Sequence, residues 1–263
     1  MKWEGKTVWV TGASSGIGAA VARAVSARGA TVVATARRED ALGALESSCP
    51  GRVHVVPADL ANIEGLSGLV GAVAEQTDAV DVLVLAAGVS QRSAAVETDP
   101  SVTETLFRLN VLSQIELCRL VLPSMIARGS GILVPVTSLA GKAGFPLRST
   151  YCATKHALHG YFEALRAETA ESGIAVTIAV PGFVRTEISR NAMQGDGTTY
   201  GRMDENQATG MRPERCAEII LRAVERGALE VRPGMGLRGR LATFLHTMAP
   251  RVFARTIRTV RPT

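Results

Sequence analysis

The sequence predicts an α/β fold with a single doubly wound parallel sheet and helices on both of its faces. Short β-branched runs alternate with longer helical patterns almost from end to end of the 263 residues. The runs are nearly all apolar rather than alternating, as expected for strands that helices cover on both sides. No stretch rich in Pro, Gly and Ser divides the chain, and 46% apolar content suffices for one large core.

Seven strands are expected in order along the chain. They are Thr7–Val10, Thr31–Ala36, Val53–Pro57, Val82–Ala86, Gly131–Thr137, Ile174–Val180 and Leu229–Val231. The first helix is expected at Ile17–Arg28, with Gly29 as its C-terminal cap. Apolar residues at helical spacing predict a long fourth helix through Val102, Leu106, Leu109, Leu117 and Leu120. The alternation predicts one domain over residues 1–233.

The net charge of +5 is consistent with nucleic acid, an anionic membrane or a phosphorylated ligand as partner. Seven of the 29 basic residues are arginines within residues 231–263, which contain no Asp or Glu. The first 230 residues contain the remaining 22 basic residues and all 24 acidic ones, so this part of the chain is mildly acidic. No nucleic-acid partner is therefore expected for the domain.

Residues 234–263 are expected to form a basic amphipathic helical extension. Apolar residues recur at helical spacing on either side of Pro250, at Leu237, Leu241, Phe244, Leu245 and Met248 and then at Val252, Phe253 and Ile257. Two interpretations remain open. The apolar face docks on the domain or on a sister subunit, or it attaches to an anionic membrane surface.

The cysteines and the N-terminus indicate a reduced, cytoplasmic protein, with peripheral membrane contact left open. Four well-separated cysteines form no Cys-x-x-Cys pair. The N-terminus lacks the apolar stretch of a secretory signal, and no run approaches the roughly 18 apolar residues of a membrane span. His156 and His159 lie at i, i+3 spacing, but no carboxylate or cysteine completes a set, so no metal is expected.

A glycine-rich turn follows the first strand. It reads Thr11-Gly12-Ala13-Ser14-Ser15-Gly16-Ile17-Gly18, and a helix begins directly after it. Such glycines let backbone amides approach a pyrophosphate, and the helix N-terminus supplies free N–H groups. The spacing is Gly-x3-Gly-x-Gly rather than Gly-x-Gly-x-x-Gly, so a plain strand-to-helix turn is the alternative interpretation.

The chain resembles the short-chain dehydrogenase/reductase family over about residues 5–233. The family's Thr-Gly-x3-Gly-x-Gly signature is met in the glycine turn, and its Tyr-x3-Lys is met at Tyr151 and Lys155, with Ser138 13 positions upstream. Further matches are Asp59-Leu60, Asn110 and Pro181-Gly182-Phe183-Val184-Arg185-Thr186. The resemblance implies a Rossmann-like fold, a nicotinamide cofactor and hydride transfer between that cofactor and a carbonyl or alcohol.

The motifs and the resemblance together assign the cofactor contacts. They are Gly12, Ser14, Ser15, Gly16, Ile17, Gly18, Arg37, Arg38, Asp59, Leu60, Ala87, Gly88, Tyr151, Lys155, Pro181, Gly182, Val184 and Thr186. The fourth strand departs from the family pattern, since Leu85-Ala86-Ala87-Gly88 stands where Asn-Asn-Ala-Gly is common. Sheet stability or cofactor seating is expected to be arranged differently there.

The end of the second strand favours NADP(H) over NAD(H). Ala36 stands where NAD-dependent members carry an acidic residue, and Arg37 stands where NADP-dependent members carry an arginine. Arginine pairs with a 2′-phosphate, and the Ser14 hydroxyl is placed to assist it. The alternative is a solvated pair of Arg37 and Arg38.

The expected catalytic residues are Asn110, Ser138, Tyr151 and Lys155. Tyr151 and Lys155 are four apart, so they share one helix face, and the ammonium is expected to favour the phenolate of Tyr151. Ser138, at the end of the fifth strand, is expected to hold the substrate carbonyl. By resemblance, Lys155 also holds the nicotinamide ribose, and Asn110 anchors a water that completes a proton relay from Tyr151.

The segment 184–212 is expected to form a substrate lid. Met193 and Tyr200 from this segment, together with Phe145, Ser138 and Tyr151, are the candidate substrate contacts. The alternative for Met193, Tyr200 and Phe145 is that they only pack the segment onto the domain. The sequence from Gly141 to Gly210 resembles that of the branch that holds the 11β-hydroxysteroid dehydrogenase-like and dehydrogenase/reductase member 7B-like enzymes. This resemblance implies a lipophilic ketone or aldehyde as the substrate. A homo-oligomer, dimer or tetramer, is expected by resemblance. The alternative function is a nicotinamide-binding regulator without turnover.

Overall fold

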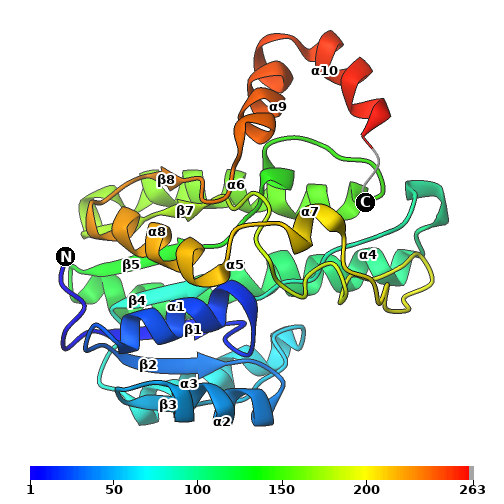
Figure 1. Ribbon diagram of the computed structural model, residues 1–263. Helices are drawn as coiled ribbons and strands as arrows, with labels where there is room; N and C mark the ends of the chain where they lie inside the picture. The colour runs from blue at the N-terminus through cyan, green and yellow to red at the C-terminus, as the bar shows by residue number, and fades with distance from the viewer. Residues whose placement is uncertain (261–263) are drawn as a thin grey trace.

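A computed structural model of the protein describes residues 1–260. Within these residues, six strands form one parallel sheet in the order β3-β2-β1-β4-β5-β6. Their bounds are β1 Thr7–Thr11, β2 Thr31–Thr35, β3 Val53–Val55, β4 Val82–Leu85, β5 Gly131–Pro135 and β6 Ile174–Val176. Figure 1 looks onto the face of this sheet, with one layer of helices in front of it and another behind it. The expected doubly wound α/β fold is confirmed.

The strand expected at Ile174–Val180 is split in the structure. Thr177 separates β6 from β7 (Ile178–Ala179), and β7 pairs in parallel with β8 (Glu230–Val231). Thr177 still donates its N–H to the Leu133 carbonyl oxygen at 2.9 Å, while its hydroxyl donates to the Ala228 carbonyl oxygen at 2.7 Å. β7 therefore pairs with β8 on one side, while its Ala179 carbonyl oxygen still accepts the Thr137 N–H, just after β5, on the other.

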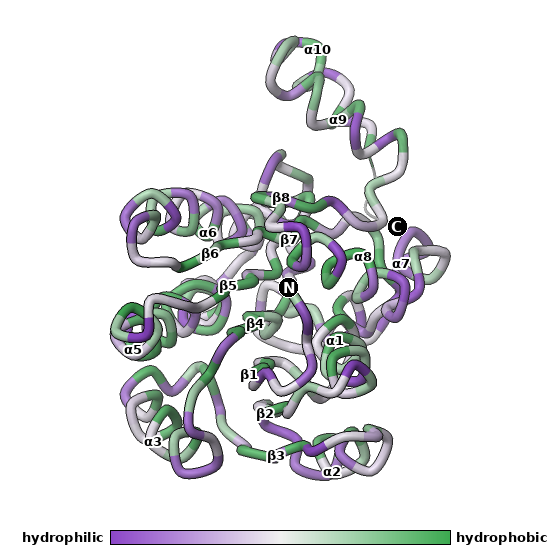
Figure 2. Tube along the Cα trace, turned by 90° about the vertical axis from the view of Figure 1, so that its left-hand side faces the viewer, coloured by the Kyte–Doolittle hydropathy of each residue, from purple (hydrophilic) through white to green (hydrophobic). Residues whose placement is uncertain are grey.

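Helices cover both faces of the sheet (Figure 2). One face carries α1 Gly16–Ser26, α2 Glu39–Ser48 and α8 Pro213–Glu225, and the other carries α3 Leu66–Gln76, α5 Ser113–Ala127 and α6 Ser149–Glu168. Alternate residues of one strand belong to different cores, with Val8 and Val10 facing α1 and α8 and Trp9 facing α3 and α5. This two-sided burial explains why the strand sequences are continuously apolar.

The long fourth helix contains a π-helical turn. α4 (Pro100–Phe107) passes through the π turn Arg108–Leu112 into α5. The whole stretch Pro100–Ala127 is long and apolar enough to cross a membrane by length and composition, but half of its apolar window is buried in the domain. Leu106, Leu117 and Met125 are fully buried, so it is a core helix of the domain.

The last helices project from the domain. The short α7 (Glu205–Ala208) lies in the lid segment, and α9 (Leu237–Met248) and α10 (Pro250–Thr256) form an arm that extends away from the body (Figure 1). Leu237, Leu241, Phe244, Met248 and Val252 in this arm are 50% to 83% exposed. Docking of this apolar face on the chain's own domain, which the first of the two interpretations allowed, is therefore not seen within residues 1–260. Arg261 of the basic segment lies outside the described residues.

Candidate active site

A cleft of about 490 Å³ opens at the carboxyl ends of the strands. The glycine turn after β1, the ends of β2 and β4, the segment after β5 and the start of the lid all contribute to it. All the expected cofactor contacts line it, namely Gly12, Ser14, Ser15, Gly16, Ile17, Gly18, Arg37, Arg38, Asp59, Leu60, Ala87, Gly88, Tyr151, Lys155, Pro181, Gly182, Val184 and Thr186. Parallel sheets bind ligands at this edge.

The glycine turn has the shape that a dinucleotide cradle needs. Gly12 has a φ of +67°, and a Cβ on it would lie 2.7 Å from the Ala87 nitrogen. A Cβ on Gly18 would lie 2.4 Å from the Gly12 carbonyl oxygen. Ser15 is the N-cap of α1, but its side chain makes no capping hydrogen bond. The N-terminal amides of α1 are therefore placed to bind a pyrophosphate.

Two arginines stand at the end of β2, where the ribose 2′ position is expected. Arg38 donates from Nη2 to the Ser14 hydroxyl at 3.2 Å and to the Ser14 carbonyl oxygen at 3.3 Å. Arg37 is exposed and also lines the cleft. It is thus Arg38 rather than Arg37 that contacts Ser14. Asp59 lies across the cleft and accepts the Ala61 N–H at 3.0 Å.

Ser138, Tyr151 and Lys155 converge at the inner end of the cleft. Tyr151 and Lys155 lie on one face of α6, with the Lys155 ammonium 5.9 Å from the centre of the tyrosine ring. Lys155 donates from Nζ to the Val136 carbonyl oxygen at 3.0 Å. The Tyr151 phenol hydrogen-bonds Ser138, whose hydroxyl also accepts the Ala140 N–H at 3.2 Å. A phenol, a hydroxyl and an ammonium thus face one space.

Burial sets the acidity of both titrating groups. It raises the pKa of Tyr151 above the ordinary tyrosine value, and the hydrogen bond from Ser138 and the positive charges of Arg148 and Arg92 only partly oppose this. Burial also lowers the pKa of Lys155 to about 8. The expectation that Lys155 brings down the pKa of Tyr151 is therefore wrong for the protein chain alone, because desolvation of the phenolate outweighs the nearby cations.

Asn110 lies in the π turn rather than in a regular helix. It is fully buried, and its side chain exchanges two hydrogen bonds of 2.9 Å with the backbone N–H and C=O of Val89. Its Nδ2 also donates to the Thr154 hydroxyl at 3.1 Å. A Cβ on Gly88 would lie 3.0 Å from Asn110 Oδ1 and 3.6 Å from Lys155 Nζ. Asn110 therefore stands beside Lys155, one layer behind the cleft wall.

The end of β4 is stabilised without the common amides. Leu85 is fully buried in the core beneath α3 and α5. The Ala87 carbonyl oxygen accepts a hydrogen bond of 3.3 Å from Gln114 Nε2 on α5. Apolar packing and a glutamine from the neighbouring helix thus replace the two missing asparagines.

The substrate candidates divide into two groups. Phe145 lines the cleft with Ser138 and Tyr151. Met193 instead packs on the apolar cluster that includes Tyr151 and Val102, and the Tyr200 ring lies 5.8 Å from the Arg92 guanidinium. Met193 and Tyr200 therefore support the cleft wall from behind.

Four polar residues of this region were not predicted from the sequence, namely Gln91, Arg92, Arg148 and Asp204. Arg92 and Arg148 line the cleft, and both pair with Asp204 from the lid. Gln91 Oε1 accepts the backbone N–H groups of Thr150 and Tyr151 at 2.9 and 3.2 Å. The sequence gives only a weak signal for this group. Arg92 follows soon after Gly88, and Arg148 lies three positions before Tyr151.

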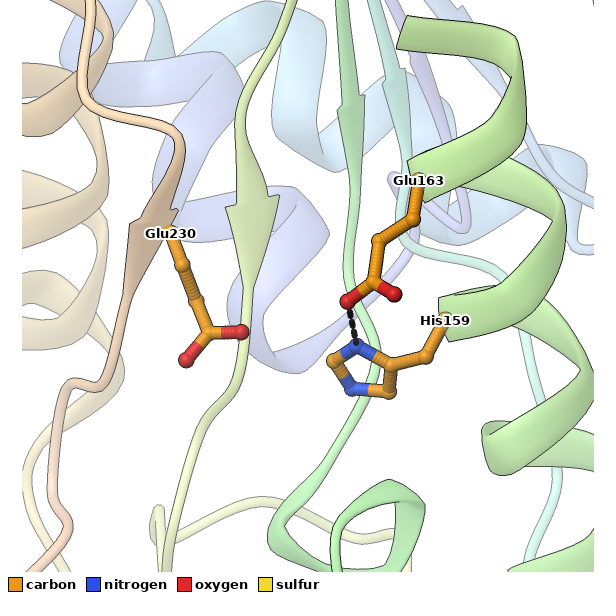
Figure 3. Close-up of side chains that lie close together, drawn as sticks. All are labelled: His159, Glu163 and Glu230. Carbon is orange, nitrogen blue, oxygen red and sulfur yellow. Dashed lines mark ion pairs between the residues drawn. The ribbon is translucent and has the colours of Figure 1, made fainter. Parts of the chain in front are cut away.

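A second cluster of titrating groups lies outside the cleft (Figure 3). His159 and Glu163 on α6 and Glu230 on β8 bring their ligand atoms within 4.8 Å of one another. The sequence reasoning missed these two carboxylates. The Lys142 ammonium lies 2.8 Å from Glu230 and 3.8 Å from Glu163, so it already supplies a cation to both. This arrangement is that of an ion-pair cluster.

Comparisons with known proteins agree with the geometry. Residues 6–197 match the family model described as short chain dehydrogenase. The chain is 36% identical over 255 residues to Dehydrogenase/reductase SDR family member 7B of Xenopus tropicalis, covering 94% of this chain and 82% of that protein.

Solved structures give the same picture. A short-chain dehydrogenase from Streptomyces avermitilis matches with a TM-score of 0.80 and 33% identity, covering 95% of this chain and 94% of that one. One from Sphingobium yanoikuyae in complex with NADPH matches with a TM-score of 0.77 and 26% identity over 97% and 96% of the chains. One from Burkholderia phymatum in complex with NAD, with a TM-score of 0.79 and 22% identity over 100% and 98%, shares the fold.

Proposed function

Because this chain belongs to the short-chain dehydrogenase/reductase family, we propose that it is an NADP(H)-dependent oxidoreductase acting on a carbonyl or secondary alcohol. The observation that carries the proposal is the convergence of Ser138, Tyr151 and Lys155 at the inner end of a cleft that begins at the glycine turn. The cradle at Gly12 and Gly18 fits a pyrophosphate, and Lys155 is placed to hold the ribose next to it. When bound, the nicotinamide supplies or accepts the hydride.

The chain's own residues handle the oxygen and the proton. In the reducing direction, Ser138 donates a hydrogen bond to the carbonyl oxygen, where negative charge develops. Tyr151 is protonated at neutral pH, as an ordinary tyrosine is, and burial raises its pKa further, so it is available as the general acid. Lys155 and the buried amide of Asn110 stand behind Tyr151 on the path by which the proton is replaced.

Two arginines support the preference for NADP(H). Arg37 and Arg38 flank the expected 2′ position, Ala36 carries no carboxylate, and Arg38 is already oriented by Ser14. A guanidinium pairs with the 2′-phosphate of NADP(H), whereas a carboxylate at this position would repel that phosphate. Fluorescence titration should give a lower dissociation constant for NADPH than for NADH, and the reverse order would contradict the preference.

The substrate is proposed to be a lipophilic ketone or aldehyde. Phe145 and Leu139 bring apolar side chains to the same cleft as Ser138 and Tyr151. A homo-oligomer, either a dimer or a tetramer, remains the proposed assembly, as it is common in the family.

A substrate screen tests the function. Ketones, aldehydes and alcohols are assayed with NADPH and NADH for wild type and Tyr151→Phe. We expect NADPH-dependent reduction that falls by at least a hundredfold in Tyr151→Phe, with NADPH binding nearly unchanged. Full activity of Tyr151→Phe would contradict the role of Tyr151. Binding of NADPH without turnover of any compound would instead favour the alternative, a nicotinamide-binding regulator.

A further inference from the structure

Three charged side chains are buried together at the substrate end of the cleft. Arg92 and Asp204 have side chains only 4% and 1% exposed, and that of Arg148 is 16% exposed. Both arginines pair with the same oxygen, Asp204 Oδ2, the Arg148 Nη2 contact being 3.0 Å. Within residues 1–260, one carboxylate therefore pairs with two guanidinium groups, so the three groups together carry one net positive charge.

The hydrogen bonding of this cluster is incomplete. Among the residues that the structure describes, the Nε atoms of Arg92 and Arg148 and the Oδ1 of Asp204 have no hydrogen-bond partner, and all three are buried. A buried charge that lacks a partner is costly, so structures rarely keep one without a use for it. A guanidinium binds carboxylate and phosphate oxygens in a planar, two-pronged way. The cluster thus has both the charge and the donors to take up a further anion.

The cluster is held in place next to the catalytic tyrosine. Arg148 is the N-cap of α6, three positions before Tyr151. Gln91 precedes Arg92 in the chain, and its side-chain oxygen accepts a hydrogen bond from the backbone N–H of Tyr151. Its backbone carbonyl oxygen accepts a second hydrogen bond, from Arg92 Nη1, at 2.7 Å. Arg92 and Arg148 line the same cleft as Ser138 and Tyr151. A substrate with its carbonyl at Ser138 therefore extends toward two fixed guanidinium groups.

We propose that the substrate of this enzyme carries an oxyanion, a carboxylate or a phosphate-type group, that binds to Arg92 and Arg148. The inference rests on the proposed function and narrows its substrate class from lipophilic ketones in general to anionic ones. The cluster selects among carbonyl substrates by the charge of the substituent that reaches Arg92 and Arg148 when the carbonyl lies at Ser138.

A purely structural role for the same residues makes different predictions. Asp204 precedes α7 in the lid, so its pairs with Arg92 and Arg148 also fasten the lid to the domain. If fastening is their only role, removing either partner loosens the lid and affects charged and neutral substrates alike. If the arginines bind an anion, removal of Arg148 and removal of the competing Asp204 carboxylate act in opposite directions on the anionic substrate.

Matched substrate pairs separate the two roles. We compare an aryl oxo acid with its methyl ester, and an oxoalkyl phosphonate with its dimethyl ester, as substrates of wild type, Arg148→Gln and Asp204→Asn with NADPH. Arg23→Gln, which changes an exposed arginine on the outer helix α1, is the control. The acid and phosphonate pairs show which anion the cluster prefers.

Wild type should use an anion at least tenfold better than its ester in kcat/KM. Arg148→Gln should reduce this ratio tenfold or more, mainly by raising the KM of the anion, and Asp204→Asn should keep or increase it. Arg23→Gln should leave the ratio unchanged. Equal use of anion and ester by wild type would overturn the inference, as would equal losses on both substrates in Arg148→Gln and Asp204→Asn. Melting temperatures of all variants identify any that fail to fold, and Arg148→Gln alone then decides.

Absence of turnover on every compound would refute the proposed function and leave the anion site to be decided by binding. Isothermal titration of the NADPH-loaded protein with the same acid and ester gives that answer. Binding of the acid only, lost in Arg148→Gln, supports the site. Equal binding of acid and ester refutes it.

Discussion

Single residues in this cleft owe their chemistry to burial more than to their neighbours in the sequence. The pKa of Tyr151 is raised and the pKa of Lys155 is lowered to about 8, both mainly by desolvation. The motif Tyr-x3-Lys predicted which side chains meet, because i and i+4 share a helix face. It could not predict the direction of the tyrosine shift, since burial comes from strands and lid segments distant in the chain.

The pH dependence of the proposed ketone reduction follows from these two shifts. Reduction needs a protonated phenol at Tyr151 and an ammonium at Lys155, so activity is lost as the pH rises. Lys155, with a pKa of about 8, titrates before Tyr151. We expect kcat/KM to fall above about pH 8 in wild type, and the residual activity of Lys155→Arg to fall only at higher pH, because arginine stays charged. Identical alkaline limbs in both proteins would assign the limb to another group.

The lowered pKa of Lys155 also predicts a cost in stability. The folded pKa of about 8 lies below the reference value of 10.5, so the charged lysine opposes folding below about pH 8, and this effect disappears above pH 10.5. After allowing for the lost hydrogen bond to Val136, Lys155→Met should stabilise the cofactor-free protein at pH 7 by about 1–3 kcal/mol. Urea unfolding at pH 7 and near pH 10.5 measures this. A destabilised Lys155→Met at pH 7 would contradict the argument, as would a gain of equal size at both pH values.

The sequence predicted most of the cofactor end of the site and little of the substrate end. Local chain geometry fixes the glycine turn, and the polar residues that follow each parallel strand meet at one edge of the sheet. Arg92, Arg148 and Asp204 come from three segments up to 112 positions apart, and only tertiary packing brings them together. For the same reason Met193 and Tyr200, assigned by composition of the lid, proved to lie behind the wall.

At the scale of the elements, the start of α6 depends on a side chain from another segment. Gln91 Oε1 accepts two N–H groups of its first turn, and Gln91 Nε2 donates to Ser93 and Thr98 at 3.0 and 2.8 Å. The N-cap residue Arg148 makes no side-chain cap of its own. Gln91 is therefore a positioning residue that fixes the first turn of α6, where Tyr151 lies.

Substitution of Gln91 should affect activity through the position of Tyr151. Gln91→Leu leaves the buried N–H of Tyr151 and the partly buried N–H of Thr150 unpaired, so we expect a loss of about 1–3 kcal/mol in unfolding free energy and a lower kcat at nearly unchanged KM for NADPH. Gln91→Glu keeps the acceptor at the positive end of the helix and should restore part of the kcat. Gln76→Leu, an exposed change on α3, is the control. Equal kcat in wild type and Gln91→Leu would refute the positioning role.

The element boundaries show where local patterns stop being informative. Six of the seven expected strands appear with ends shifted by no more than two residues, because apolar runs between turns define them. The remaining one, expected at Ile174–Val180, breaks at Thr177, whose hydroxyl donates to the Ala228 carbonyl oxygen. The π turn at Arg108–Leu112 was not predicted, because the apolar spacing of this stretch is that of one continuous helix. Such turns are frequent at functional sites, and this one holds Asn110.

At the scale of the whole molecule, charge and shape separate into two parts. The domain is mildly acidic, and the arm formed by α9 and α10 carries arginines with no Asp or Glu. Within the arm, the His246 and Phe253 rings meet edge to face at 5.1 Å, so the two helices pack on each other. The sequence predicted the basic amphipathic pattern, but whether the apolar face is covered depends on the direction in which the arm leaves the domain. The arm leaves most of that face to solvent.

An exposed apolar face with arginines around it favours interfacial binding to an anionic membrane over docking on the domain. We expect the protein to co-sediment with phosphatidylglycerol vesicles, less so with phosphatidylcholine vesicles or at high salt, because the arginines supply the electrostatic part of the attraction. The double variant Leu241→Glu/Phe244→Glu should lose this binding, whereas Val96→Glu, which changes a 93% exposed valine outside the arm, should retain it. Equal sedimentation of the double variant and wild type would refute membrane attachment. If wild type does not sediment and the double variant changes only the molar mass in analytical ultracentrifugation, the arm covers a sister subunit instead.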